Sequence, residues 1–384
     1  MDRRRTMPVL PVEAYTSQEW FDRERERIFS RTWAYAGFAE DISEPGQYLS
    51  VQAGLNNIFI VMGRDRRLRA FHNICRHRGT QLLRAVGQTQ RAIVCPYHDW
   101  TYDLEGQLIS VPNREQEFPN LDLSCIALKA ASVDLWRGML WVHPEASAGS
   151  IMRWFGDVES HLGPHNVDQL VEDPKSRTEH TIAANWKIVV ENYIDGYHLA
   201  HLHSGTLAMY DHSRIESGFV GPHFAFWEPL APEYAKRLEQ SAPYPLVVPT
   251  EQAGAWVPML FPGIGLAETE SSWSIFHVTP LAPDRTRVVT RTKTADASIW
   301  AYMHQAVRSY GFWAGRVRGK FAGDGDSDDP MASGDFMAED VYACEQQQRS
   351  LRSPYFEHGP SSVRGEAGVR RHQQLVQEWV AGDA

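Results

Sequence analysis

A pair of Cys/His loops constrains this chain more than any other feature. The first loop, CRHRG, supplies Cys75 and His77, and the second, CPYHDW, supplies Cys95 and His98. Thiolates and imidazoles bind zinc and iron–sulfur clusters alike, so the ligand types do not choose the metal. Zinc fingers usually take two cysteines from one loop and two histidines from another. One cysteine and one histidine per loop instead favour a 2Fe–2S cluster with thiolates on one iron and imidazoles on the other, with zinc as the alternative.

The two loops closely resemble the Rieske signature of the ring-hydroxylating oxygenases, in which CRHRG is followed by CPYH and an aromatic residue. Tyr102 and Gly106 extend the resemblance beyond the second loop. It implies that the two cysteines and two histidines hold a Rieske cluster. The sequence departs from the family at Asp99, where glycine is more usual. We expect a carboxylate beside an outer ligand to lower the reduction potential of the cluster or to alter the docking of a partner.

Length and composition bound the class of protein. With 384 residues, 43% of them hydrophobic, the chain can form two domains with substantial cores. No apolar run approaches the roughly 20 residues of a membrane span, and the basic N-terminus lacks the apolar segment of a secretory signal, so we expect a cytoplasmic location and no membrane partner. The net charge of −10 disfavours nucleic acid as a partner. The remaining cysteines, Cys125 and Cys344, are too few for a disulfide framework.

Changes in periodicity divide the chain into three parts. Ser17 is placed to cap an amphipathic helix in an N-terminal arm, residues 1–39, which we expect to pack on the catalytic domain. Short alternating segments with glycine turns predict a small antiparallel β domain for the cluster over residues 40–148. After Pro144 the periodicity becomes helical, which indicates a second domain over residues 149–384. The fold class is therefore α+β, and in the resembled family the second domain is a helix-grip fold.

Within the second domain, the pattern predicts an antiparallel sheet with helices on one side. Strands are expected at residues 178–185, 223–230, 256–268 and 271–295, the last segment folding into a hairpin at Pro283 and Asp284. Helices are expected at residues 297–319 and 335–351 and at the C-terminus, with a Gly/Asp/Ser loop over 321–334.

A second polar cluster lies in NWKIVVENYIDGYHLAHLHS, residues 185–204. Asp195 and His198 are three residues apart, so they would face the same way on an α-helix. His198 and His203 are five apart, which places them about 140° apart around a helix. If both bind one metal, the helix must bulge or end between them, and the Ser-Gly pair after His203 offers an end. On helical geometry alone, His201 would be the better partner for His198.

The resemblance favours His203 instead. D-x2-H-x4-H after NW-K-x3-EN resembles the iron motif of the Rieske oxygenases, which implies that His198 and His203 bind a mononuclear Fe(II) beside a catalytic Asp195. Non-haem iron oxygenases commonly complete two histidines with one carboxylate. We assign Asp340, because AEDVYACEQQQR resembles the family segment that opens a helix.

Other polar residues near these motifs have alternative roles. Asn192 is expected near the iron as a further catalytic residue, whereas Glu191 is expected to cap or pair structurally. The carboxylates that compete with our assignment of the third ligand are Asp324, Asp326, Asp328, Asp329, Asp335 and Glu339. Most of the first four are expected to be solvated loop charges.

By resemblance, the two motifs together identify the chain as a member of the Rieske non-haem iron oxygenases, α (oxygenase) subunit. In that family the cluster passes electrons to the mononuclear iron, which reduces dioxygen and inserts oxygen into an organic substrate. No G-x-G-x-x-G follows a strand and no ferredoxin-type cysteine cluster occurs, so NAD(P)H and flavin are expected on a separate reductase, with a ferredoxin as a further candidate partner. We expect a homotrimer in which electrons cross between subunits. An assembly with an additional β subunit is the alternative.

The substrate is the least constrained inference. Some family members hydroxylate aromatic rings, and others demethylate or hydroxylate quaternary ammonium compounds and betaines held in aromatic cages. We expect a small aromatic substrate and a role in aromatic catabolism, because some ammonium-specific relatives carry Glu where this chain has Asp195. The alternative from a different class of protein is a Rieske electron-transfer protein with an inactive second domain. That protein would hold no iron beyond the cluster.

Overall fold

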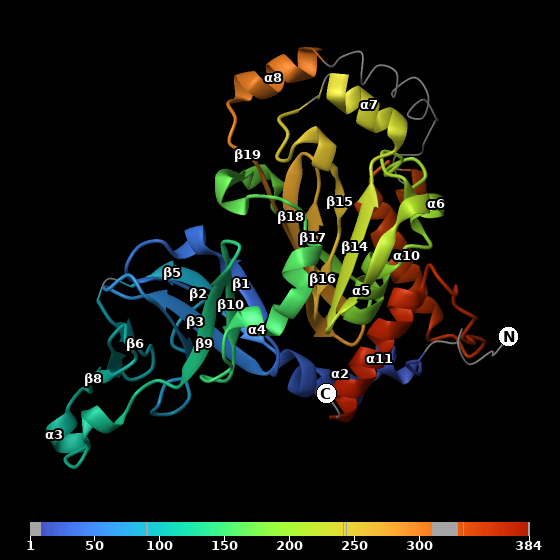
Figure 1. Ribbon diagram of the computed structural model, residues 1–384. Coiled ribbons are helices and arrows are strands. Elements are labelled where there is room, and N and C mark those ends of the chain that lie inside the picture. The colour runs from blue at the N-terminus through green and yellow to red at the C-terminus, as the bar shows by residue number, and fades with distance from the viewer. Residues whose placement is uncertain are drawn as a thin grey trace. The chain divides into compact units, whose positions relative to one another are not determined.

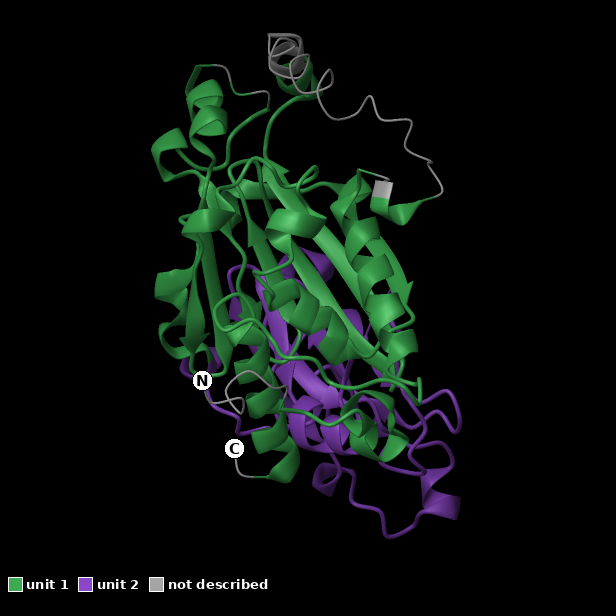
Figure 2. Cartoon of the chain, turned by 90° about the vertical axis from the view of Figure 1, so that its right-hand side faces the viewer, with its two compact units in different colours: residues 1–22, 155–384 green, residues 23–154 purple. Residues whose placement is uncertain are grey.

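The computed structural model describes residues 9–89, 91–240, 242, 244–308, 329–332 and 334–382. The chain forms two compact units, one of Arg23–Trp154 and one that combines Met1–Asp22 with Phe155–Ala384 (Figure 2). The predicted arm is therefore divided between the units. Its second half belongs to the smaller unit, because β1 (Ala34–Phe38) pairs with β10 (Met139–His143) in that unit's sheet.

The smaller unit is built on antiparallel strands (Figure 1). A seven-stranded sheet has the order β1-β10-β9-β4-β3-β2-β5, and a three-stranded sheet has the order β6-β7-β8. The further strands of this unit are β2 (Gln47–Ala53), β3 (Asn56–Met62), β4 (Leu68–His72), β5 (Val86–Gln88), β6 (Ile93–Val94), β7 (Thr101–Tyr102), β8 (Leu108–Ser110) and β9 (Ala130–Trp136). Its short helices include α3 (Arg114–Glu117) and α4 (Ile151–Phe155), the latter ending at the first residue of the larger unit.

Strand β3 explains how the cluster loops are anchored. It lies inside the sheet, and its consecutive apolar residues Ile58–Val61 are all buried, so the strand is covered on both faces. Ile58 and Ile60 belong to one core, while Phe59 and Val61 belong to a second core. The cysteines of both loops lie in that second core, which therefore fixes the inner half of the cluster site.

The larger unit contains a nine-stranded antiparallel sheet. The main path runs β11-β19-β18-β17-β15-β14-β13, with β12 beside β19 and β16 beside β14 and β17. The strands are β11 (Leu170–Glu172), β12 (Thr178–Ile182), β13 (Glu216–Val220), β14 (His223–Pro229), β15 (Gly254–Trp256), β16 (Met259–Leu260), β17 (Ile264–Glu268), β18 (Ser272–Ala282) and β19 (Arg285–Ala295). The predicted hairpin at Pro283 and Asp284 is present between the last two strands.

Helices cover one face of this sheet. Helix α5 (Trp186–Ile194) contacts β18, α10 (Phe336–Ser350) contacts α5, and α11 (Ala367–Ala381) contacts α5 and β13. The other described helices of the unit are α1 (Glu13–Thr16), the first part of α2 (Gln18–Glu24), α6 (Leu199–Leu202), α7 (Pro232–Gln240) and α8 (Ile299–Arg308). Antiparallel sheets with helices confirm the α+β fold class, including the helix-grip arrangement of the larger unit.

Several elements differ from the sequence prediction. Strands β1, β5, β11 and β13 and helix α7 were not predicted, because each is short or strongly polar. The N-terminal helix begins after Ser17, whose Oγ accepts from the Trp20 amide at 3.3 Å, and it changes to a π-helix at Arg25–Phe29 before β1 starts. Of the helix predicted over 297–319, the described part is α8, and residues 309–328 lie outside the description.

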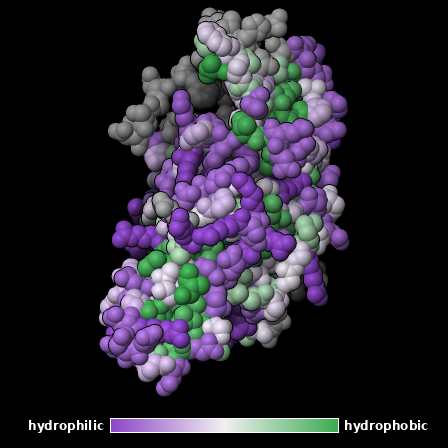
Figure 3. Space-filling view, turned by 90° about the vertical axis from the view of Figure 1, so that its left-hand side faces the viewer, coloured by the Kyte–Doolittle hydropathy of each residue, from purple (hydrophilic) through white to green (hydrophobic). Residues whose placement is uncertain are grey.

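No described helix is both long and apolar enough to cross a bilayer. On the face drawn in Figure 3, hydrophilic side chains predominate and hydrophobic ones occur between them in small groups. Such scattered apolar side chains are normal for a protein surface in water.

Candidate metal centres

The two cluster loops share one backbone pattern. In each loop the cysteine amide donates to a carbonyl five residues later, and the amide four residues later donates back to the cysteine carbonyl. These bonds run from Cys75 N to Thr80 O, Gly79 N to Cys75 O, Cys95 N to Trp100 O and Asp99 N to Cys95 O. Residues 79 and 99 occupy equivalent positions and both have positive φ, +76° and +53°. The glycine expected by the family at the second position therefore corresponds to a left-handed backbone that glycine adopts without strain.

Burial separates the sulfur end of the site from the imidazole end. Cys75 and Cys95 are 3% and 2% exposed, whereas His77 is half-buried and His98 is exposed. The two imidazole rings are adjacent, with centroids 4.8 Å apart. Two thiolates inside and two imidazoles outside match the donor set of a Rieske cluster, in which one iron has cysteine ligands and the other has histidine ligands.

Hydrogen-bond donors surround the sulfur atoms. Burial raises the pKa of the Cys95 thiol, and the backbone amides of Tyr97 and His98 oppose this by donating to its sulfur. The Tyr102 hydroxyl lies 3.3 Å from Cys75 Sγ and accepts from the Arg76 amide at 3.0 Å. When the sulfur is a thiolate, that hydroxyl must donate to it. The loops therefore stabilise negative charge on both sulfur atoms.

Aromatic side chains line the imidazole end. Trp100 stacks on His77 with a centroid distance of 4.8 Å and an angle of 6°, and Phe118 lies edge-on to His77 at 5.9 Å. Burial, reinforced by the nearby His98, lowers the pKa of His77, which keeps its imidazole in the neutral form that a metal requires. Sequence reasoning missed Phe118, whose only signal was an aromatic residue at the end of the charged segment REQEF.

The second site forms where the helical stretch breaks. Helix α5 ends at Ile194, and Asp195 is its extended C-cap. His198 then caps the N-terminus of α6, and His203 caps its C-terminus with ψ of 21°. Asp195 and His198 are thus not on one continuous helix, and the break that the five-residue spacing required occurs at both ends of α6.

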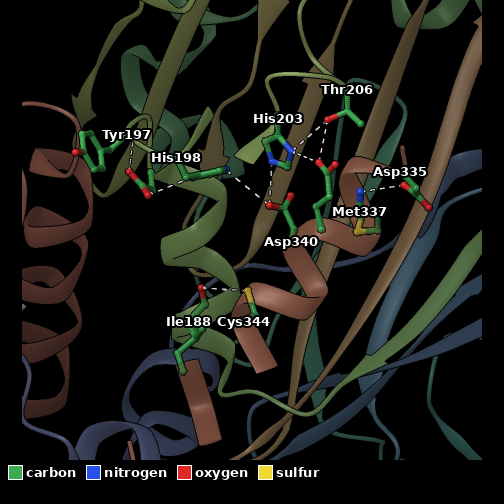
Figure 4. A network of polar contacts seen from close by, with 11 residues as sticks. Ile188, Tyr197, His198, His203, Thr206, Asp335, Met337, Asp340 and Cys344 are labelled. Carbon is green, nitrogen blue, oxygen red and sulfur yellow. Dashed lines mark hydrogen bonds and ion pairs between the residues drawn. The ribbon is translucent and has the colours of Figure 1, made fainter. Parts of the chain in front are cut away.

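The break brings two metal-ligand side chains together with a third from α10. Ligand atoms of His198, His203 and Asp340 all lie within 4.8 Å of one another. Asp340 Oδ1 is 3.7 Å from His198 Nε2 and 3.0 Å from His203 Nε2, and the two imidazole centroids are 5.0 Å apart. Figure 4 shows the three side chains converging from the α6 segment and α10. Two histidines and one carboxylate form the donor set that non-haem Fe(II) enzymes use, with coordination positions left open.

Carboxylates hold the other nitrogen of each imidazole. Asp195 Oδ2 lies 3.2 Å from His198 Nδ1, and Glu339 Oε2 lies 2.7 Å from His203 Nδ1. The Thr206 hydroxyl donates to the same Glu339 oxygen at 2.9 Å. Each carboxylate accepts a hydrogen bond from Nδ1–H, which leaves Nε2 free to bind a metal.

The charge around His203 favours a cation. Burial lowers the pKa of this imidazole, but hydrogen bonds and negative charge from Asp340 and Glu339 outweigh burial and raise it overall. Sequence reasoning considered Glu339 only as a competing third ligand. The sequence signal for this role was that Glu339 directly precedes Asp340. The two carboxylates contact the two ring nitrogens of the same imidazole, His203.

The remaining predicted residues are not members of this set. His201 is exposed and packs edge-on against Tyr197 at 5.6 Å. Asn192 is half-buried on the last turn of α5, and its carbonyl accepts from the Asp195 amide at 3.3 Å. Glu191 accepts from the Tyr15 hydroxyl at 2.7 Å, in line with its expected structural role.

Two of the competing carboxylates cap backbone amides instead. Asp335 is the N-cap of α10 and accepts from the Met337 amide at 3.0 Å, and Asp329 accepts from the Met331 amide at 2.9 Å. Asp324, Asp326 and Asp328 lie outside the described residues.

Comparison with known families matches both units. Residues 32–129 match the model of the Rieske [2Fe-2S] domain, and residues 167–382 match the ring hydroxylating alpha subunit (catalytic domain). The chain belongs to the ring-hydroxylating α-subunit family. Its cofactors are accordingly a Rieske 2Fe–2S cluster and a mononuclear iron, as expected from the two motifs.

The curated relatives that match this chain are named for quaternary ammonium substrates. The carnitine monooxygenase oxygenase subunit of Acinetobacter pittii is 31% identical over 201 residues, 51% of this chain and 53% of the relative. The match thus spans about half the length of that relative. The glycine betaine monooxygenase oxygenase subunit of Chromohalobacter salexigens is 26% identical over 397 residues, 94% of this chain and 83% of the relative.

Solved structures of both substrate classes share the fold. The quaternary ammonium Rieske monooxygenase CntA in complex with L-carnitine has a TM-score of 0.71 at 21% identity, covering 97% of this chain and 95% of that one. Naphthalene 1,2-dioxygenase from Rhodococcus sp. bound to indole covers 96% of this chain and 94% of its own at 20% identity. A related naphthalene 1,2-dioxygenase structure has a TM-score of 0.69. At these identities the likeness supports the fold alone.

Proposed function

We propose that this chain is the terminal oxygenase component of a multicomponent system that oxidises a small quaternary ammonium compound or betaine. Electrons come from a separate NAD(P)H-dependent reductase, with or without a ferredoxin. The observation that carries the oxygenase assignment is the convergence of His198, His203 and Asp340 within 4.8 Å. An electron-transfer protein with an inactive second domain would have no need for a complete two-histidine, one-carboxylate set.

The chain's own residues prepare both sites. Cys75, His77, Cys95 and His98 would hold the 2Fe–2S cluster, and the three convergent side chains would hold the iron. When bound, the iron supplies dioxygen activation and the cluster supplies single electrons. Asp195 and Glu339 keep the Nε2 atoms of the two histidine ligands unprotonated by holding the proton on Nδ1. Asn192, one turn before Asp195 on α5, stays a candidate catalytic residue.

The names of the relatives support the ammonium substrate over the aromatic one that the sequence favoured. Two monooxygenases that act on carnitine and glycine betaine match this chain, the second over 94% of its length. The expectation of an aromatic substrate rested on Asp195 in place of Glu. Aspartate and glutamate accept a hydrogen bond from a histidine N–H equally well, so this difference is weak support for either substrate class. Aromatic hydrocarbon catabolism is accordingly not part of the proposal.

We further propose that electrons cross between subunits of a ring, which we take to be a homotrimer. His98 is exposed at the outer end of the cluster site, so it is available for docking against another chain. Asp195 already accepts from His198 Nδ1 with one oxygen and from the Tyr197 amide with the other. A carboxylate with remaining lone pairs can accept a further hydrogen bond from the outer ligand of a neighbouring cluster.

Metal content and coupled turnover test the proposal. The oxygenase should contain about three iron atoms per chain, two of them with acid-labile sulfide, whereas an electron-transfer protein would contain about two. Purified oxygenase with a reductase should consume NAD(P)H and dioxygen with carnitine, glycine betaine or choline, and formation of a carbonyl product or a demethylated amine should match consumption. Turnover with benzoate or naphthalene but with none of the three ammonium compounds would overturn the substrate class and leave the oxygenase assignment standing.

Mixed oligomers test the crossing of electrons. Chains with Cys95→Ser lack the cluster, and chains with His203→Ala lack the iron. Co-assembled oligomers should recover part of the activity, because some interfaces then pair an intact cluster with an intact iron. Absence of recovery in proven mixed oligomers would reject transfer between subunits.

A further inference from the structure

A row of side chains crosses the sheet of the larger unit on the face away from α5. Residues paired across antiparallel strands lie on the same face of a sheet. Glu216 of β13 pairs with Trp227 of β14, Trp227 pairs with Trp256 of β15, and Trp256 pairs with Glu268 of β17. These four side chains therefore point to one side.

The side they point to is opposite the helix that leads to the iron ligands. A side chain at Gly265 of β17 would meet the ring of Tyr193, which belongs to α5. Alternate residues along a strand face opposite sides, so Gly265 and Glu268 lie on different faces. The row of Glu216, Trp227 and Trp256 is thus separated from α5 by the thickness of the sheet.

A cavity of about 430 Å³ opens over this row. That volume lies in the usual range of small-molecule sites. Its walls are formed by consecutive residues of β13 (Glu216–Val220) and β14 (Ala225–Trp227), together with Trp256 of β15 and His161, the last residue of the 3₁₀ helix Gly156–His161.

The cavity has the chemistry of a site for an organic cation. The indole rings of Trp227 and Trp256 lie with centroids 6.5 Å apart at 49°, and both are half-buried. Gly254 permits this placement, because a Cβ there would come within 3.1 Å of Trp227 Nε1. Glu216 is exposed, and its carboxylate makes no ion pair or hydrogen bond with the described part of the chain. Two π faces and a carboxylate without a cationic partner on one side of a cavity attract a methylated ammonium group.

We propose that this cavity binds a small organic cation with a methylated ammonium group, at a site separate from the iron. The two indoles contact the methyl groups and Glu216 supplies the counter-charge. Because the site lies on the other face of the sheet from α5, its occupant is not positioned for oxidation at the iron ligands. This inference does not depend on the substrate proposed above.

Calorimetric titration of the intact oxygenase with choline tests the site. The matched neutral probe is 3,3-dimethylbutan-1-ol, in which carbon replaces the charged nitrogen. Choline should bind at least about fivefold more tightly than the neutral probe, because cation–π attraction and the carboxylate act on charge. Glu216→Gln and Trp256→Leu should each weaken choline binding by about fivefold or more, and Glu216→Gln should remove most of the preference for choline.

Two further variants locate the binding. Glu179→Gln makes the same change of charge at an exposed position on β12 and should leave choline binding unchanged. His203→Ala removes an iron ligand and should leave this binding event in place, even if choline is also a substrate. Unaltered Rieske absorption and near-UV circular dichroism verify folding of each variant. Choline binding that is undetectable, that is insensitive to both cavity substitutions, or that disappears only with His203→Ala would overturn the proposal.

Discussion

The two candidate metal centres are built in opposite ways. The cluster loops place four ligands between Cys75 and His98, and each loop closes its own hydrogen bonds around its cysteine. The iron site takes two ligands from a break in one helical stretch and the third from α10, and His203 and Asp340 are 137 residues apart. The first centre takes all its ligands from two turns that share one core, whereas the second requires the packing of α5 against α10.

The polar groups behind the ligands also differ. Donors surround the cluster cysteines, because amide N–H groups and the Tyr102 hydroxyl point at sulfur. Acceptors surround the iron histidines, because Asp195 and Glu339 accept hydrogen bonds from Nδ1–H. Donors stabilise an electron-rich thiolate, whereas acceptors orient an imidazole and increase its basicity. Substitutions in the two centres should therefore have separable effects.

Loss of a cluster thiolate should have the largest effect. Cys95→Ser should abolish the visible absorption and the EPR signal of the Rieske cluster, because serine cannot replace a buried thiolate in the inner pair of ligands. Cys125→Ser is the control, since Cys125 is exposed and lies in the same unit. A normal Rieske spectrum from the Cys95 variant would disprove the ligand assignment.

Loss of an iron ligand should abolish turnover but spare the cluster. His203→Ala should lower the iron content from about three atoms per chain to about two and leave the Rieske spectrum intact. His201→Ala is the matched control two residues away, because His201 is exposed and lies outside the convergent set. The reverse pattern, with iron lost only from the His201 variant, would show that the site forms on a regular helix.

These two centres also differ in how far the sequence could predict them. Both cysteines and both histidines of the cluster follow from local spacing, because the loops determine their own geometry. At the iron site, helical periodicity alone favoured His201, and only the family motif selected His203. The periodicity failed because it assumed a continuous helix, whereas α5 ends at Ile194 and α6 begins after His198.

Contacts between distant segments were the part that sequence could not supply. The role of Glu339 depends on how α10 lies beside α6, and the spacing of residues along the sequence does not determine that arrangement. The cavity over Trp227 and Trp256 depends on the register of strands that include β13, which was not predicted because ESGFV has no apolar alternation. The overall fold class and the hairpin at Pro283 were predictable, because long alternating strands carry their own signal.

Removal of one supporting carboxylate should weaken the iron site without destroying it. Glu339→Gln replaces the acceptor of the His203 Nδ1 proton with a neutral amide, and we expect iron affinity to fall by about 10-fold to 100-fold. Glu345→Gln makes the same change on the same helix, where Glu345 accepts from the Ala183 amide at 3.0 Å, and should retain iron. Competition with an iron chelator measures the difference. Equal retention by both variants would show that Glu339 does not support the ligand.

Removal of one supporting donor should shift the cluster potential by a modest amount. Tyr102→Phe deletes the hydroxyl 3.3 Å from Cys75 Sγ. Because a donor stabilises the reduced, more negative cluster, we expect the potential to fall by about 20 to 60 mV, the equivalent of one ordinary hydrogen bond. Tyr97→Phe removes a hydroxyl that contacts Arg78 rather than sulfur and should change the potential much less. Voltammetry that finds equal shifts for both would contradict the assigned bond.

The smallest effect is expected at Asp99, where charge and backbone conformation can be separated. Its φ of +53° repeats the φ of +76° at Gly79, the equivalent position of the other loop. Asparagine tolerates this left-handed conformation about as well as aspartate, so Asp99→Asn should remove the charge alone. The residue is exposed, so solvent screens its charge and the potential should rise by only about 10 to 20 mV.

Asp99→Gly removes the same charge and also the Cβ. Its potential should therefore match that of Asp99→Asn, while its loop should be slightly more stable to thermal loss of the cluster, because glycine adopts positive φ without strain. Equal potentials with unequal thermal stability would show that backbone geometry, and not electrostatics, underlies the preference for glycine at this position. A potential that changes only in the glycine variant would contradict the expected effect of the charge, because the loop conformation rather than the carboxylate would then control the potential of the cluster.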